Sequence, residues 1–222
     1  MRKFTGFGER AIDFYDGLLA DNSKAYWTDN RDVYESDVRE PMQALLDDLA
    51  AEFGHFGSAK IFRPYRDVRF SRDKTPYKTH CGAVIESGRG AGAYYVQVGP
   101  AGLVMGGGTF HTSGDQLRRF RESVADDLRG EPLVAILAKL RRQGWQIRGE
   151  RLKTTPRGYP ADHPRIDLLR HKSLYASVVY EPDDALHGPE AADRVRSRWR
   201  QLRQFNEWAA DHVGLADQRN PR

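Results

Sequence analysis

The residues with the clearest chemical potential lie between Phe62 and Lys78, in the sequence FRPYRDVRFSRDKTPYK. These seventeen residues hold six cations and two anions, a net charge of +4, which equals the formal net charge of the whole 222-residue chain. Guanidinium, ammonium, hydroxyl and backbone N–H groups together suit the oxygens of a phosphate or a carboxylate. We therefore expect an anion-binding site here, formed by Arg66, Arg69, Arg72, Lys74 and Lys78.

The same charges also fit a second interpretation, an ion-pair frame that only supports the fold. In that case the cations of the segment meet carboxylates of the flanking helices, for which the sequence offers Asp13, Asp16, Asp29 and Glu35. Exposed ion pairs of this kind add little stability each. If residues 65–72 form an extended strand, Val68 and Phe70 share one face and belong in the core.

The elements that must position this segment can be read from the periodicity of apolar residues. Steps of three and four residues predict helices, and short β-rich runs between glycine-containing turns predict strands. Helices are expected over residues 7–19, 33–53, 113–128, 164–170 and 191–213 and from Pro132 onward, and strands over residues 81–87, 93–99, 103–110, 144–147 and 173–180. The order of these elements predicts one α+β domain over residues 1–222, with a mainly antiparallel sheet flanked by amphipathic helices. Residues 214–222 are expected to be frayed.

Composition narrows the class of protein. With 39% hydrophobic and 30% charged residues, the chain is long enough to bury a core and too rich in apolar bulk for disorder. No uncharged apolar run approaches the roughly 20 residues that span a bilayer, so no membrane partner is expected. Cys81 is the single cysteine, which fits a reducing compartment and predicts a cytoplasmic protein. The seven histidines show no metal-ligand spacing, and no metal site is expected.

Several long stretches resemble one known family. Phe62-Arg63 followed by YRDVRFSRDKTPYKTHCGA is similar to the signature of the domain of unknown function 2461 family, and FYDGLLADNSKAYWTDNRDVYE resembles that family's opening. LKTTPRGYPADHPRIDLLRHKSLYA resembles its second motif, and AYYVQVGPAGLVMGGG resembles the part between. The likeness runs from about Phe4 to Trp208. It implies one structural unit and no particular activity, substrate or cofactor.

The resemblance also singles out a second basic segment, from Arg148 to Lys172. Seven cations and three anions give it a net charge of +4 as well. If both segments line one hollow, their fields add and select an anion, and we expect Lys153 and Arg157 to join the site. His163 is the candidate proton carrier, although its place before Pro164 favours a structural role at the start of a helix.

Two functions from different classes follow. The first is an enzyme or binding protein for a phosphorylated or carboxylated small molecule. The second is a non-catalytic module that binds nucleic acid or an acidic protein, because aromatic residues interleaved with cations suit base stacking. The aromatic residues in question are Tyr65, Phe70, Tyr77, Tyr94 and Tyr95. The sequence specifies neither a reaction, nor a cofactor, nor an oligomeric state.

Overall fold

One antiparallel sheet organises the chain in the computed structural model, which describes residues 3–54, 58–86 and 91–217. The strand order is β1-β2-β3-β4-β6-β5. The strands are β1 (Ala59–Ile61), β2 (Cys81–Glu86), β3 (Ala93–Gly99), β4 (Gly102–Thr109), β5 (Gln146–Arg148) and β6 (Leu174–Tyr180). Every pairing of these strands is antiparallel. The α+β class and the antiparallel sheet predicted from the sequence are confirmed.

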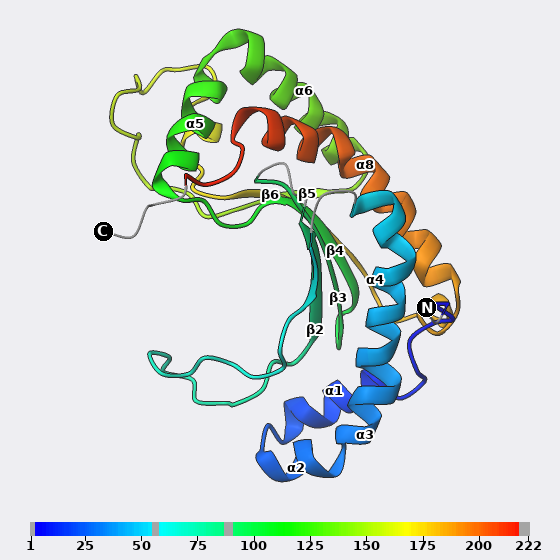
Figure 1. Ribbon diagram of the computed structural model, residues 1–222. Helices are drawn as coiled ribbons and strands as arrows, with labels where there is room; N and C mark the ends of the chain where they lie inside the picture. Colours follow the sequence, from blue (N-terminus) through cyan, green and yellow to red (C-terminus); the bar gives the residue numbers. More distant parts are fainter. Residues whose placement is uncertain (1–2, 55–57, 87–90, 218–222) are drawn as a thin grey trace.

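The two faces of the sheet differ in what covers them. On β3 the side chains of Tyr94, Val96 and Val98 are buried, whereas Tyr95 and Gln97, which point the other way, are half-buried. Helices α4 (Glu40–Phe53) and α8 (Glu190–His212) run along the convex side, and the concave side faces away from them (Figure 1). The core therefore lies between the sheet and these helices, and the concave face is left partly open.

The amino-terminal helices differ from the prediction in one informative way. Residues 33–53 form a π-helix (Tyr34–Arg39) followed by α4, rather than one uniform helix. Pro41 lies in the first turn of α4 and has no N–H to donate to Asp37 O. That carbonyl instead accepts a hydrogen bond from the N–H of Gly8 (2.9 Å). The helices before it are α1 (Ala11–Ala20), α2 (Lys24–Asp29) and α3 (Arg31–Val33).

The remaining helices follow local capping rules. Ser113 accepts from the backbone N–H of Gln116 and caps α5 (Gly114–Ala125), as the sequence predicts. The next helix begins earlier than expected, because the Asp126 side chain accepts from Arg129 N and starts it ahead of Pro132. The other helices are α6 (Asp127–Arg142), α7 (Ile166–Leu169), the 3-10 helix η2 (Asp184–His187) and α8. Within the described ranges, no helix is both long and apolar enough to cross a bilayer.

The chain after α8 is tied to α5 instead of being frayed over all of residues 214–222. Arg119 donates from Nε to Val213 O (2.6 Å) and from Nη1 to Asp217 (3.0 Å). Gln116 Nε2 donates to Gly214 O (2.8 Å). These contacts hold the chain as far as Asp217, and residues 218–222 lie outside the described residues.

Candidate functional site

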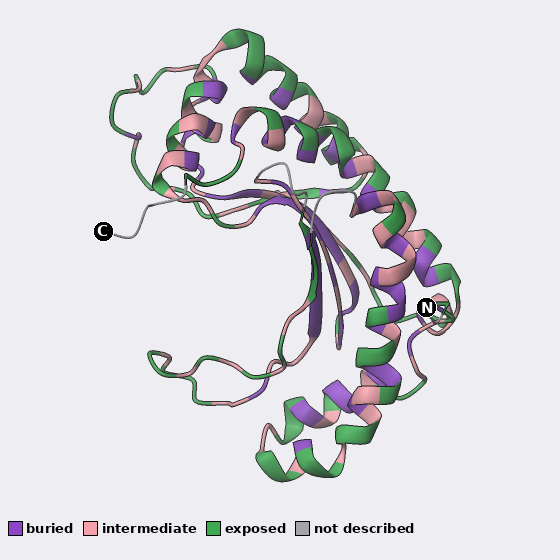
Figure 2. Cartoon of the chain, in the orientation of Figure 1, coloured by how far each residue is buried: buried purple, intermediate pink, exposed green. Residues whose placement is uncertain are grey.

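The first basic segment forms a projecting loop between β1 and β2. Its two arms pair through Arg66 N to Pro76 O (2.8 Å) and Lys78 N to Pro64 O (2.7 Å). The loop extends from the sheet below the concave face (Figure 1) and is largely exposed (Figure 2). Phe70 is 98% exposed, so the predicted extended strand with Val68 and Phe70 in the core is wrong. The chain turns back at residues 69–70, and no second layer covers the tip.

Most cations at the tip of this loop already have partners within the loop. The Arg69 guanidinium lies 2.7 Å from the Asp67 carboxylate, and that of Arg66 lies 2.5 Å from Asp73. The backbone N–H of Thr75 and then the Arg66 guanidinium lower the pKa of Asp73 to about 2. An ion-pair frame therefore exists, but these two pairs are local: each joins residues of the same loop.

The two other cations of the tip differ from these arginines. The ammonium of Lys74 donates to Val68 O (2.9 Å). Arg72 is exposed, and its side chain makes no polar contact within the described part of the chain.

The base of the loop is anchored to the helices at Tyr77. The rings of Tyr77 and Trp27 stack with centroids 4.6 Å apart and an interplanar angle of 8°. Asn22 donates from Nδ2 to Tyr77 O (3.1 Å) and accepts from Tyr77 N at Oδ1 (3.0 Å). Two stretches about 50 residues apart in sequence thus meet at one residue, which fixes the position of the neighbouring Lys78.

A bulge next to Tyr77 leaves two backbone N–H groups, those of Thr79 and His80, outside the pairing of the two arms. Phe62 N–H donates to Gly82 O (2.9 Å), while Lys78 N–H donates to Pro64 O. One residue on the first arm therefore faces three on the second, including Thr79 and His80. Within the described residues, the backbone N–H groups of Thr79 and His80 donate to no protein acceptor. Free N–H groups in a bulge are suitable donors to an anion.

These groups line a hollow of about 410 Å³, which we name the Lys78 hollow. Its walls are Leu19, Asn22, Arg66, Asp73, Thr75, Tyr77, Lys78, Thr79 and His80. The Lys78 ammonium donates to Arg63 O (2.9 Å), and no carboxylate lies within ion-pair distance of it among the described residues. Burial lowers the pKa of Lys78, and the charges of Arg63 and Lys60 lower it further. Lys78 is therefore an uncompensated cation among other cations.

Two titratable neighbours define what the Lys78 hollow can do chemically. Burial, and then the charge of Lys78, lowers the pKa of His80, so its imidazole is neutral at pH 7. Burial raises the pKa of Cys81 to about 12, and the buried thiol is not a nucleophile at neutral pH. Cys81 lies in the core, whereas its neighbour His80 lines the Lys78 hollow.

The loop, its anchor and the second basic segment all lie in the part of the chain that matches a family. Residues 10–208 match the family described as Conserved hypothetical protein (DUF2461). The chain belongs to the DUF2461 family. No curated protein and no solved structure shows a significant match to the chain.

The second basic segment of this DUF2461 chain lies elsewhere. Residues 148–172 lie beside α5 and α6, at the opposite end of the concave side from the loop (Figure 1). Lys153 and Arg157 are both exposed, and neither of them lines the Lys78 hollow. The expectation that the two segments line one hollow is therefore wrong.

Most charges of the second segment take part in contacts that support the fold. Arg165 is buried and donates from Nε to Val124 O (2.6 Å) and from Nη2 to Ala125 O (2.9 Å), at the end of α5. It also pairs with Asp127 at 2.5 Å. His163 Nδ1 accepts from the N–H of Arg165 (3.0 Å), so His163 has a structural role before α7. The other pairs in the segment are Arg151 with Asp167, Arg170 with Asp167, and Lys172 with Glu150.

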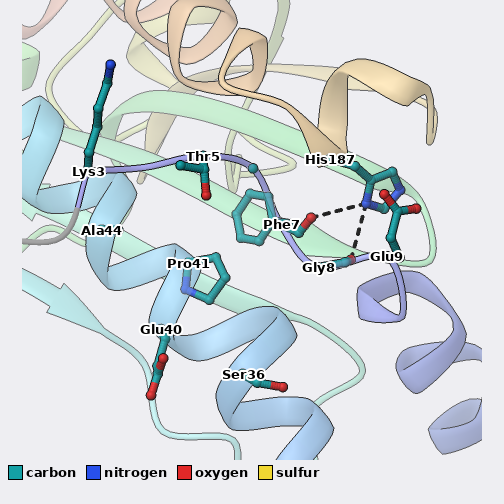
Figure 3. Close-up of a pocket in the computed structure, with 11 residues that line it drawn as sticks. Lys3, Thr5, Phe7, Gly8, Glu9, Ser36, Glu40, Pro41, Ala44 and His187 are labelled. Carbon is teal, nitrogen blue, oxygen red and sulfur yellow. Dashed lines mark hydrogen bonds between the residues drawn. The ribbon is translucent and has the colours of Figure 1, made fainter.

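A separate hollow in this DUF2461 chain, of about 440 Å³, lies between the amino-terminal segment, the start of α4 and η2 (Figure 3). His187 Nδ1 lies 3.2 Å from both Phe7 O and Gly8 O, so this nitrogen carries the proton and donates. Two carboxylates, Glu9 and Glu40, line the hollow with one ammonium, Lys3. This balance disfavours an anion, so the Lys78 hollow is the better anion site.

Several groups of the candidate site are not among the residues that the sequence predicts to bind the anion. Lys60, Arg63, Asn22, Thr79 and His80 either line the hollow or act on Lys78. Asn22 lies in a turn far away in the sequence, and the bulge that exposes Thr79 has no composition signal. Lys60 belongs to a short edge strand that was not predicted. Arg63 is one of the six cations of the first basic segment, but it was not among the residues expected to bind the anion.

Proposed function

We propose that this protein binds a small phosphorylated or carboxylated molecule in the Lys78 hollow. The observation that carries the proposal is the contrast between Lys78 and the arginines of the same loop. Arg66 and Arg69 have carboxylate partners, whereas the Lys78 ammonium contacts, among the described residues, a carbonyl oxygen and the ring of Phe62 but no carboxylate. A half-buried ammonium without a counter-charge gains more from a bound anion than an exposed, paired guanidinium does.

The groups around Lys78 give the anion more than one contact. Hydrogen bonds can be donated to the anion by the free N–H groups of Thr79 and His80 and by the hydroxyl of Thr79. The guanidinium of Arg66 also lines the hollow, although it is already paired with Asp73. Lys60 and Arg63 add positive charge, as their effect on the pKa of Lys78 indicates. This set matches the oxygens of one phosphate or carboxylate group rather than an extended polyanion.

A pair of lysine variants tests the proposal. Lys78→Met should weaken binding of inorganic phosphate or of a phosphometabolite at least tenfold in isothermal titration calorimetry. Lys74→Met is the matched control, because Lys74 lies in the same loop and its ammonium also donates to a carbonyl oxygen at 2.9 Å, but it does not line the hollow. Equal losses in both variants would indicate a general charge effect and contradict the proposed site.

The proposal extends to the cellular compartment and to a possible role for His80 in proton transfer. A single buried cysteine suits a reducing compartment, and we place the function in the cytoplasm. If the ligand is turned over, the neutral imidazole of His80 is the group placed to accept a proton beside the bound anion.

One observation favours the second candidate, a module that binds nucleic acid or an acidic protein. Phe70 is 98% exposed and Tyr65 is 51% exposed, both on a loop of positive charge. Aromatic rings beside cations can stack on the bases of a single strand. If this function holds, a single-stranded oligonucleotide binds with steep salt dependence and Phe70→Ala weakens binding several-fold. The matched control is Leu128→Ala, which removes an equally isolated exposed apolar residue on α6.

A further inference from the structure

A second hollow lies on the concave face of the sheet, next to the Lys78 hollow. Its volume is about 530 Å³, which is within the size range of pockets that bind small molecules. It is lined by Phe62, Val84, Glu86, Ala91, Gly92, Ala93, Tyr95, Phe110, His111, Gln116 and Leu215. We name it the aromatic hollow, because three rings, those of Phe62, Tyr95 and Phe110, form part of its wall.

The rings of the aromatic hollow form a continuous row across the sheet. The centroids of Phe62 and Tyr95 are 6.4 Å apart, and those of Tyr95 and Phe110 are 5.8 Å apart. Phe110 in turn stacks on Tyr175 at 4.8 Å. The hydroxyl of Tyr95 donates to Gln97 Oε1 (2.7 Å), so its polar atom is satisfied by the protein. What remains for a ligand is therefore apolar ring surface, which favours a planar apolar group.

The two hollows adjoin where Lys78 contacts the ring of Phe62. The Lys78 ammonium, which lines one, lies 5.4 Å from the centroid of the Phe62 ring, which lines the other. Lys60 is directly opposite Val84 in the β1–β2 register, and Val84 is opposite Tyr95 in the β2–β3 register. Opposite residues share a face of the sheet, so Lys60 adds a second cation beside the rings.

The charges restrict where the anionic group of a ligand can lie. Among the described residues that line the aromatic hollow there is no lysine or arginine, and there is one carboxylate, Glu86. An anionic group is therefore disfavoured inside this hollow and favoured at its border, beside Lys78. An apolar ring is favoured inside the aromatic hollow, where it can lie against the rings of Phe62, Tyr95 and Phe110.

We infer that the ligand is an aryl anion, with its phosphate or carboxylate at Lys78 and its ring against Phe62, Tyr95 and Phe110. This inference rests on the proposed function, since it assigns a substrate class to the ligand of the same site. It predicts that the ring, and not only the anionic group, contributes to affinity. Stacking on one aromatic side chain is worth on the order of tenfold in affinity or more.

Two phosphate monoesters test the inference by calorimetry. Phenyl phosphate should bind the wild-type protein at least tenfold more tightly than methyl phosphate, which has the same charged group and no ring. Tyr95→Leu should remove this preference and leave the affinity for methyl phosphate unchanged. Phe110→Leu serves as a second variant in case the first does not fold, and Tyr159→Leu, in the second basic segment, is the control that should keep the preference.

The possible outcomes distinguish a failure of the aryl inference from a failure of the anion site itself. Equal affinities for the two esters, both abolished by Lys78→Met, would overturn the aryl inference and leave the anion site standing. Failure of both esters to bind would contradict the anion site and the aryl inference together. A preference for phenyl phosphate that survives in Tyr95→Leu and in Phe110→Leu would also overturn the inference, because the ring would then bind elsewhere.

Discussion

The ammonium of Lys78 lies 5.4 Å from the centroid of the Phe62 ring, and this pair joins a basic hollow to an aromatic one. Lys78 reaches this position because its neighbour Tyr77 is clamped by Asn22 and stacked on Trp27. The opening helices, the projecting loop and the concave face of the sheet thus meet at the candidate site.

The clamp on Tyr77 should control anion affinity. Asn22→Ala removes both hydrogen bonds to the backbone of Tyr77 and should reduce stability by about 1–3 kcal/mol. Because Lys78 follows Tyr77 directly, phosphate affinity measured by calorimetry should also fall several-fold. Asn30→Ala is the control, since Asn30 Nδ2 donates only to Tyr26 O within α2. An unchanged affinity in folded Asn22→Ala would mean that the clamp does not position the site.

Arg165 should be important for stability and irrelevant to ligand binding. Arg165→Met leaves two carbonyl groups at the end of α5 without their donor and should reduce the free energy of unfolding by about 2–4 kcal/mol in urea denaturation. Arg157→Met removes the same charge from an exposed position of the same segment and should have little effect. A loss of phosphate affinity in either folded variant would return the second basic segment to the site.

Glu52 should contribute stability that depends on pH. Its carboxylate on α4 accepts from Arg200 and Arg203 on α8, and the Arg200 hydrogen bond is the main cause that lowers the pKa of Glu52. Since the folded-state pKa lies below the unfolded one, about 4.3, the contribution is present above pH 4.3 and is lost as pH falls through the folded value. Glu52→Gln should therefore lower the melting temperature at pH 7 and have less effect near pH 3. An equal decrease at both values would exclude this linkage.

The Lys78 ammonium should give anion binding an alkaline limit. Burial, Arg63 and Lys60 lower its pKa from the ordinary value of 10.5, so affinity should begin to fall below pH 10.5. Sulfate is the suitable ligand, because it does not titrate in this range. Lys78→Arg keeps its charge and should show a flat profile from pH 7 to 10. The same decline in both proteins would assign the pH dependence to another group.

Regular elements were predictable from the sequence because their apolar periodicity reports which face is buried. The helical spacing of apolar residues in α8 and the alternation of buried and half-buried residues in β3 are examples. The glycines of β4 allow close packing against α8, since a Cβ on Gly107 would lie 2.8 Å from a Leu202 methyl. The loop tip was not predictable in this way. Phe70 looks like a core residue by composition, but the turn at residues 69–70 places it in solvent.

The candidate site was predictable in part. The concentration of charge indicates the loop that carries the proposed site, and it includes Lys78 and Arg66. It could not show that Arg69 is paired with Asp67 two residues away, or that residues 148–172 lie at the other end of the concave side. Equal net charge in two segments says nothing about their distance in space, which depends on packing against α5 and α6.

The most direct test of the anion site is a backbone amide NMR titration with inorganic phosphate. Saturable shifts should appear at Lys78, Thr79 and His80, whose N–H groups lie at the proposed site, and at Asn22. The amides of Lys153 and Arg157 should not move. Shifts confined to the second basic segment, or no saturable shifts at the Lys78 hollow, would contradict the account.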